Sequence, residues 1–149
     1  MGLTFEEFFT EQRWVTQGRT VTEGEVAQFC GLSGDFNPLH SDEEHCRATP
    51  FGTRIAHGPM TLSMAIGLMS QLNLINGTAM GLLNLNWDFR APVKPGDTIH
   101  AVVTTRSVRP TRAGHGVVVL ALEVKNQTGA VVQEGALTLL MKSGHSRTA

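Results

Sequence analysis

The sequence GPMTLSMAIGLMSQL, residues 58–72, is apolar on nearly every side of a helix. It opens with Gly58-Pro59, and proline is favoured in the first helical turn because its missing N–H would have no partner there. A helix that is apolar all round is normally buried within its domain. The stretch therefore predicts one long central helix that the rest of the chain covers.

Strand patterns follow this helix. Residues 83–90, LNLNWDFR, alternate apolar and polar side chains, which is the period of a half-buried strand. Three further segments are rich in Val, Thr and Leu: Thr98–Val108, Gly116–Lys125 and Ala130–Lys142. Residues 126–129, NQTG, have the composition of a hairpin turn. We predict an α+β fold in which four antiparallel strands curl around the central helix.

Two shorter helices are predicted before it. Thr22 and Glu25 have the spacing of a capping box, and Gly31 can end the helix that follows. A second capping box, residues 41–44, predicts a short helix that ends before Pro50. The loop SGDFNPLH, residues 33–40, lies between these helices and carries candidate reactive groups.

The composition limits the class of protein. With 149 residues, 41% of them hydrophobic and 17% charged, the chain fits one globular domain spanning residues 1–149. A net charge of −1 gives no electrostatic reason to expect nucleic acid as a partner, and no apolar run is long enough to cross a membrane. Two cysteines without CxxC spacing, and no signal-peptide pattern, favour a reduced, cytoplasmic protein.

Asp35 and His40 flank a turn-forming segment in that loop. Asn37 must leave the α region because Pro38 follows it, so the two side chains are expected to come close together. A carboxylate beside an imidazole can hold and polarise a water molecule. The sequence also allows a purely structural interpretation, in which Asp35 caps a turn and His40 is a solvated neighbour of the next helix.

His57-Gly58 stands at the start of the central helix, where free N–H groups favour a developing negative charge. Glycine permits close approach of a ligand carbonyl, so this is a candidate oxyanion hole. An ordinary helix start, with His57 packed on the loop, is the alternative. A metal site made of Asp35, His40 and His57 matches no familiar ligand spacing, so we expect no metal.

Residues 29–40, FCGLSGDFNPLH, closely resemble the signature of the MaoC-like hydratases, the (R)-specific enoyl-CoA hydratases. Further segments resemble this family in order and spacing: GRTVTE (18–23), PFG (50–52), IAHG (55–58) and FRAPVKPGD (89–97). The resemblance spans nearly the whole chain. Two positions depart from it: Cys46 stands where the family usually has Ala or Ser, and Pro59 removes one N–H beside Gly58.

The resemblance implies a single hot-dog fold, an antiparallel sheet wrapped around one long helix, and a homodimer with acyl-CoA entering between subunits. It implies reversible hydration of a trans-2-enoyl-CoA to the (3R)-3-hydroxyacyl-CoA, with no cofactor beyond the CoA thioester substrate. Asp35 and His40 match the family's catalytic pair, and the Gly58 N–H would bind the thioester oxygen. Asn37, which shapes the turn, and His57 complete the predicted oxyanion and substrate-binding part of the site.

Alternative functions remain open at this point. The substrate could be a branched or dicarboxylic enoyl-CoA of the mesaconyl-CoA type, or the protein could bind acyl thioesters without catalysis. A hot-dog thioesterase would be expected to carry an acidic residue on or near the central helix, and residues 60–72 contain none. Arg90, Lys94 and Arg109 are candidates for contacts with the CoA phosphates.

Overall fold

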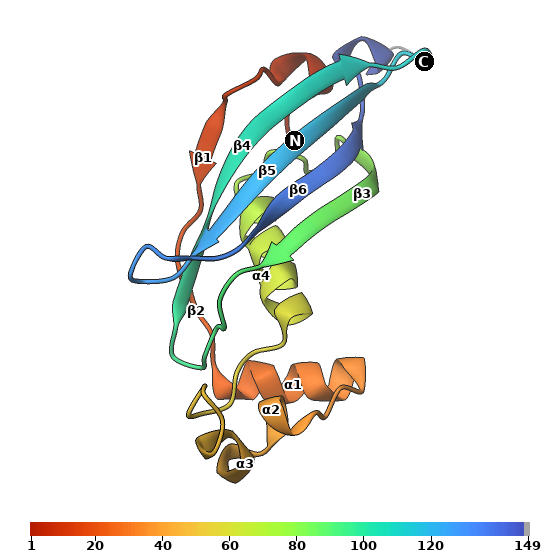
Figure 1. The fold of residues 1–149 in the computed structure, drawn as a ribbon. Helices are drawn as coiled ribbons and strands as arrows, with labels where there is room; N and C mark the ends of the chain where they lie inside the picture. The colour runs from red at the N-terminus through yellow and green to blue at the C-terminus, as the bar shows by residue number, and fades with distance from the viewer. Residues whose placement is uncertain (148–149) are drawn as a thin grey trace.

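In a computed structural model, which describes residues 1–147, a long helix lies in the concave face of an antiparallel sheet (Figure 1). The helices are α1 (Glu23–Ser33), α2 (Pro38–Ser41), α3 (Glu43–Arg47) and α4 (Gly58–Gln71), with 3-10 turns η1 (Phe5–Glu7) and η2 (Gly144–Arg147). The strands are β1 (Arg13–Val15), β2 (Arg19–Thr20), β3 (Ala79–Phe89), β4 (Thr98–Pro110), β5 (Gly116–Lys125) and β6 (Val131–Met141). The predicted central helix is α4, and the predicted hot-dog architecture is confirmed.

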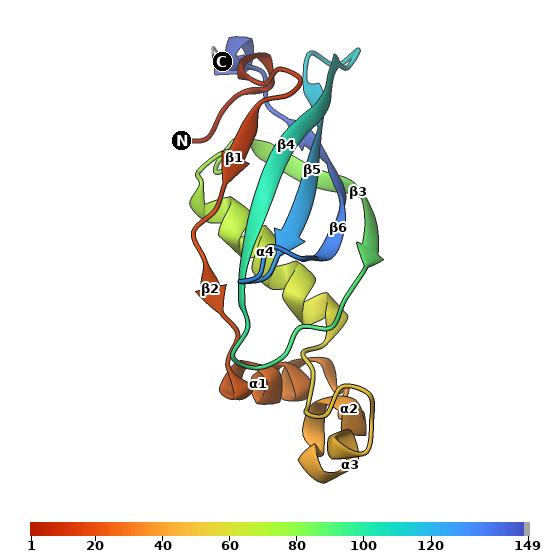
Figure 2. The same ribbon diagram turned by 60° about the vertical axis from the view of Figure 1, so that its left-hand side comes forward.

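The sheet order is β1-β4-β5-β6-β3, and the short strand β2 also pairs with β4. Figure 2 shows how these strands curve around α4. Val103, Leu120 and Leu137 project from three neighbouring strands and pack with Met69 of α4 in one hydrophobic cluster. A second cluster joins Met60, Ala65 and Leu68 of α4 to Ile99 and Val124 of the sheet. We call α4 and the sheet together the body.

Helices α1 to α3 form a separate group at the end of the body where α4 begins (Figures 1 and 2). We call residues 22–57 the helical cap. Its buried residues are Val26, Cys30, Cys46, Ala56 and His57. The cap connects directly to the first residue of α4, so the candidate site lies where the two regions meet.

Two predicted boundaries in the cap are wrong by a few residues. Helix α1 begins after the Thr22 capping box as predicted, but it continues past Gly31 to Ser33. It ends there because Gly34 adopts a left-handed φ of 76°, which glycine does at little cost. The N-cap of α3 is Asp42, which accepts a hydrogen bond from the His45 amide, rather than Ser41.

Strand β3 is more exposed than its alternating pattern predicts. Leu83, Leu85 and Phe89 share one face with Trp87, but only Trp87 is half-buried, and the other three are 38–56% exposed. The strand lies at the edge of the sheet and contains two irregularities in its pairing with β6. Alternation therefore identified side chains that share a face, but most of them are left uncovered by residues 1–147.

Within the described residues, every helix falls short of the length and apolar character needed to cross a membrane.

Candidate active site

The turn that carries Asp35 is built from short-range hydrogen bonds of polar side chains. The Asp35 N–H donates to Ser33 Oγ (3.1 Å), and its carboxylate Oδ1 accepts from the Asn37 N–H (3.1 Å). Asn37 is the N-cap of α2, and its side-chain oxygen accepts from the Leu39 N–H (3.0 Å). Asp35 therefore does cap a turn, yet its second carboxylate oxygen stays available, and its side chain is 52% exposed.

His40 lies on α2 with one ring nitrogen tied to the backbone. Its Nδ1 is 2.8 Å from the carbonyl oxygen of Ile55, and because a carbonyl only accepts, Nδ1 carries the proton of that bond. The opposite nitrogen, Nε2, is 3.9 Å from Asp35 Oδ2. The predicted approach of the two side chains is confirmed, at a separation too long for a direct hydrogen bond.

Gly58 is the first residue of α4, so its N–H has no partner inside the helix. Among the described residues, no side chain caps this N-terminus, whereas Thr22, Asn37 and Asp42 cap α1, α2 and α3. A Cβ at Gly58 would lie 2.8 Å from Cε1 of Phe89, which explains why a glycine fits here. The helix start therefore presents an uncapped N–H, with Pro59 supplying none.

His57 is placed differently from the prediction that it contacts substrate. Its side chain is buried, at 1% exposure, and its ring stacks on His40 with centroids 3.7 Å apart. Its Nε2 is 3.0 Å from the carbonyl oxygen of Asp35. The packing interpretation is therefore correct for this side chain, because α1 and the Asp35 loop cover it.

Asn37 is exposed at the start of α2. Its side-chain oxygen is engaged at the start of α2, which matches the predicted role in shaping the turn. Its hydrogen bonds support the turn on which Asp35 and His40 stand.

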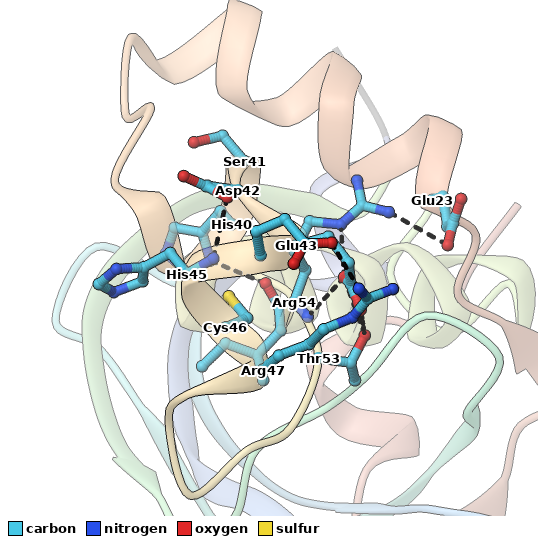
Figure 3. A network of polar contacts seen from close by, with 12 residues as sticks. Glu23, His40, Ser41, Asp42, Glu43, His45, Cys46, Arg47, Thr53 and Arg54 are labelled. Atoms are coloured by element: carbon cyan, nitrogen blue, oxygen red, sulfur yellow. Dashed lines mark hydrogen bonds and ion pairs between the residues drawn. The ribbon is translucent and has the colours of Figure 1, made fainter.

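Sequence reasoning missed a network beneath this turn (Figure 3). Arg54 forms ion pairs with Glu43 of α3 (3.0 Å) and Glu23 of α1 (3.2 Å) and directly precedes Ile55, whose carbonyl holds His40. Hydrogen bonds from the Thr53 hydroxyl and from Arg54 lower the pKa of the Glu43 carboxyl, and the same carboxylate raises the pKa of Arg54. These charges are far apart in sequence, so no local pattern could reveal them.

Cys46, one of the departures from the family signature, is fully buried under the same turn. Its S–H donates to the carbonyl oxygens of Pro38 (3.3 Å) and Leu39 (3.4 Å). Burial, followed by the nearby Glu43 and Asp42 charges, raises the pKa of this thiol. Cys46 therefore supports the turn as a neutral donor and is poorly suited to act as a nucleophile.

Asp35, His40 and His57 each offer a ligand atom within 4.8 Å of the others. Their spacing in the sequence matches no familiar metal-ligand pattern. His40 Nδ1 and His57 Nε2 are already engaged with backbone carbonyls, which leaves His40 Nε2 and the buried Nδ1 of His57 as free ring nitrogens. A metal would have to displace these contacts or reach a covered atom, so the donor set is a poor fit.

Two hollows flank the first turns of α4. One, of about 400 Å³, lies between α1 and α4 and is lined by Phe29, Leu32, Met60 and Met64 together with polar residues. The other, of about 300 Å³, contains Gly58 itself and is lined mainly by apolar side chains: Phe51, Ile55, Phe89 and Val93. Either can take an apolar group beside the uncapped helix start.

The three candidates for phosphate contacts have different surroundings. Arg90 is paired with Asp88 (3.2 Å) and Glu134 (2.7 Å), and Lys94 donates to the Phe51 carbonyl (2.7 Å). Both cations are therefore already engaged, and Arg109 is exposed on β4.

Comparison with known proteins places this arrangement in a family. Residues 7–128 match the family model described as MaoC like domain. The (R)-specific enoyl-CoA hydratase of Rhodospirillum rubrum is 30% identical over 93% of this chain and 92% of its own. The structure of a protein described as a monoamine oxidase regulatory protein, from an Archaeoglobus species, superposes with a TM-score of 0.89 at 33% identity, covering 95% of both chains.

The (R)-hydratase of Aeromonas caviae involved in PHA biosynthesis superposes with a TM-score of 0.77 at 29% identity, covering 90% of this chain and 97% of that one. The family model, the relative and the hydratase structure all indicate the family that residues 29–40 resemble. The chain belongs to the MaoC-like domain family.

Proposed function

We propose that this protein is a hydro-lyase that reversibly adds water to a trans-2-enoyl-CoA and gives the (3R)-3-hydroxyacyl-CoA. The names of its relatives, (R)-specific enoyl-CoA hydratases from two bacteria, support this reaction class. The observation that carries the proposal is the tautomer of His40. Its Nδ1–H is committed to Ile55, so the lone pair of Nε2 faces the carboxylate of Asp35 across 3.9 Å.

In this mechanism one water molecule sits between the two side chains. It donates one hydrogen bond to His40 Nε2 and the other to Asp35 Oδ2, a geometry that leaves its oxygen lone pair free. As that oxygen attacks C3, the pair takes up one proton from the water, and a proton is then delivered to C2. A positioned base of this kind contributes roughly 10²–10⁴ in rate.

The negative charge that builds on the thioester oxygen is accepted by the start of α4. The Gly58 N–H is the donor, and the helix dipole adds to its effect over the first turn. Pro59 contributes no N–H, so the helix offers one donor fewer beside Gly58. The apolar hollow that contains Gly58 would receive part of the acyl thioester.

We also propose that two chains associate through β3. This edge strand exposes Met80, Leu82, Leu83, Leu85 and Phe89, each between 38 and 56% exposed. An exposed, apolar edge strand is a template for pairing with another chain. A second copy would cover these residues, and light scattering at micromolar concentration should then give at least a dimer.

The proposed reaction requires no cofactor or metal, since the substrate supplies the CoA thioester and the protein supplies the base and the oxyanion donor. Straight, branched and dicarboxylic enoyl-CoAs, including mesaconyl-CoA, are the substrates to compare. A protein that binds these thioesters without hydrating them is the alternative.

The test is spectrophotometric and uses the purified protein with trans-crotonyl-CoA. Loss of the enoyl-thioester absorbance, with a product oxidised by an (R)-specific 3-hydroxyacyl-CoA dehydrogenase, is the expected result, and EDTA should leave the rate unchanged. A product of (S) configuration, or binding without turnover across straight, branched and dicarboxylic enoyl-CoAs, would overturn the proposal. Inactivation by EDTA that is restored by metal would instead support a metal site at Asp35, His40 and His57.

A further inference from the structure

One buried imidazole connects all three parts of the candidate site. His57 is the N-cap residue of α4, so its backbone leads directly into the Gly58 N–H. Its ring lies nearly parallel to that of His40, with an interplanar angle of 24° and centroids 3.7 Å apart. Its Nε2 contacts the carbonyl oxygen of Asp35 at 3.0 Å. No other residue among those described contacts both proposed catalytic residues and adjoins Gly58 in sequence.

The orientation of the His57 ring is fixed on several sides. Phe29 of α1 packs against it with ring centroids 4.9 Å apart, and Cys30 Sγ is 3.7 Å from Nε2. The side chain is 1% exposed, so neither water nor a substrate can reach it without movement of α1 or the Asp35 loop. Any effect of His57 on the reaction must therefore pass through its neighbours.

Its hydrogen bond reaches the backbone of Asp35. Asp35 lies in an exposed loop, and the other hydrogen bond of its own backbone joins its N–H to Ser33 within the cap. The bond from His57 is the one that links the Asp35 backbone to the residue adjoining α4. Because a carbonyl oxygen only accepts, His57 Nε2 carries the proton, and an aromatic ring without that N–H could not replace it.

The buried Nδ1 of His57 has no hydrogen-bond partner within the described part of the chain. Burying an unpaired polar atom is unfavourable, so packing alone would be better served by a phenylalanine. An imidazole at this position provides the N–H that donates to the Asp35 carbonyl oxygen. The unfavourable burial of Nδ1 and the hydrogen bond from Nε2 together indicate that His57 does more than fill space.

We infer that His57 is a positioning residue, which holds the Asp35 backbone and the His40 ring in register with the Gly58 N–H and does not contact substrate. This inference rests on the proposed function, because it assigns a role toward that reaction. Fixed geometry matters here, since a misplacement of about 1 Å at a reacting group can cost roughly 10²-fold in rate.

Two substitutions separate the ring stack from the hydrogen bond. His57→Phe keeps a flat ring against His40 but removes the donor to Asp35, while His57→Gln keeps an amide N–H at nearly the Nε2 position. Val26→Ala is the control, because Val26 is buried in α1 but forms no ring contact or hydrogen bond with His57, His40 or Asp35. We expect kcat to fall roughly 10²-fold in His57→Phe and KM to change less than about threefold.

His57→Gln should recover at least part of that kcat, and Val26→Ala should lose thermal stability without a comparable loss of kcat. A wild-type kcat in His57→Phe would overturn the inference. So would a loss of kcat that follows Tm equally in all three variants, because that would be a purely structural effect.

A second measurement does not depend on turnover. The Asp35 carbonyl precedes the Phe36 amide, so loss of its hydrogen bond should shift the Phe36 ¹⁵N resonance in His57→Phe but not in Val26→Ala. An unmoved Phe36 resonance would overturn the positioning role. If that resonance moves as expected while the wild-type protein hydrates no enoyl-CoA, the proposed function fails, but the structural part of this inference stands.

Discussion

The helical cap and the body are stabilised by different interactions. The body buries two hydrophobic clusters between α4 and the sheet, and Val26 and Ala56 of the cap pack into the second of them. The cap buries five residues, and its elements are joined largely by polar contacts, including the Thr22 capping box, the Asx-type bonds around Asp35 and the two ion pairs of Arg54.

This difference indicates that the body determines stability and that the cap carries the reacting side chains. Changes in the body should act on folding, because its residues lose packing when truncated. Changes at Asp35 or His40 should act on the reaction, because these side chains project from a loop and from the short helix α2, whose backbones are supported by other residues. His57 and Gly58 lie at the junction, where a change can affect both.

The largest expected effect is on catalysis and comes from the cap. In His40→Gln the base is lost, so kcat with trans-crotonyl-CoA should fall by roughly 10²–10⁴ while Tm changes little. His45→Gln is a matched control in the same cap, because His45 is exposed on α3 and should retain wild-type turnover. Near-wild-type turnover in His40→Gln would remove this residue from the mechanism.

The next effect is on stability and comes from the body. Leu120 is fully buried in β5, so Leu120→Ala should lower the free energy of unfolding by about 2–5 kcal/mol, measured by urea titration. Val119→Ala is the control, because Val119 lies on the opposite face of the same strand and is only half-buried. A cost at Leu120 no larger than that at Val119 would contradict the assignment of the core.

A smaller effect is expected at the network under the catalytic turn. Arg54→Met removes both ion pairs that join α1 and α3, and it should lower Tm by roughly 2–6 °C and kcat by roughly tenfold. Arg47→Met removes one exposed pair with Glu44 and should change neither quantity measurably. Equal changes of Tm and kcat in the two variants would mean that the Arg54 network does not support the Ile55–His40 contact.

The smallest effect is a pH dependence far from the site. Burial would raise the pKa of Glu6, but hydrogen bonds from the Gly144 N–H, from Ser143 and from His145 lower it to about 2. The unfolded chain then binds more protons than the folded chain between about pH 5 and pH 2, so stability falls as pH falls through that range.

Glu6→Gln should therefore reduce the slope of Tm against pH over this range. Glu44→Gln, an exposed carboxylate at the other end of the molecule, should keep the wild-type slope. An unchanged slope in Glu6→Gln would show that the contact between the N-terminal and C-terminal segments does not respond to this carboxylate.

The sequence predicts the body better than the cap. Residues 58–72 and the three Val-rich segments correctly predict α4, β4, β5 and β6, because hydrophobic periodicity reflects burial along a single element. The exposure of β3 could not be predicted, since alternation shows which side chains share a face but not what covers that face.

For the site, the turn chemistry around Asn37 correctly predicted that Asp35 and His40 come together. The Ile55 carbonyl and the Arg54 network were missed because backbone groups and long-range ion pairs leave no local pattern. Packing of His57 on the loop was one of the two interpretations that the sequence allowed, but its stacking on His40 was not predicted. Burial and stacking depend on how α1 folds over the loop, which a linear pattern does not record.

The most direct test of the central claim measures kcat and Tm together in Asp35→Asn, with trans-crotonyl-CoA as substrate. Asparagine keeps an oxygen that can accept the Asn37 N–H bond, so the turn should survive while the charge is lost. We predict that kcat falls by roughly 10²–10⁴ and that Tm stays within about 2 °C of wild type. Full turnover in this variant, or a loss of activity that only accompanies unfolding, would contradict the assignment of the chemistry to the Asp35–His40 pair.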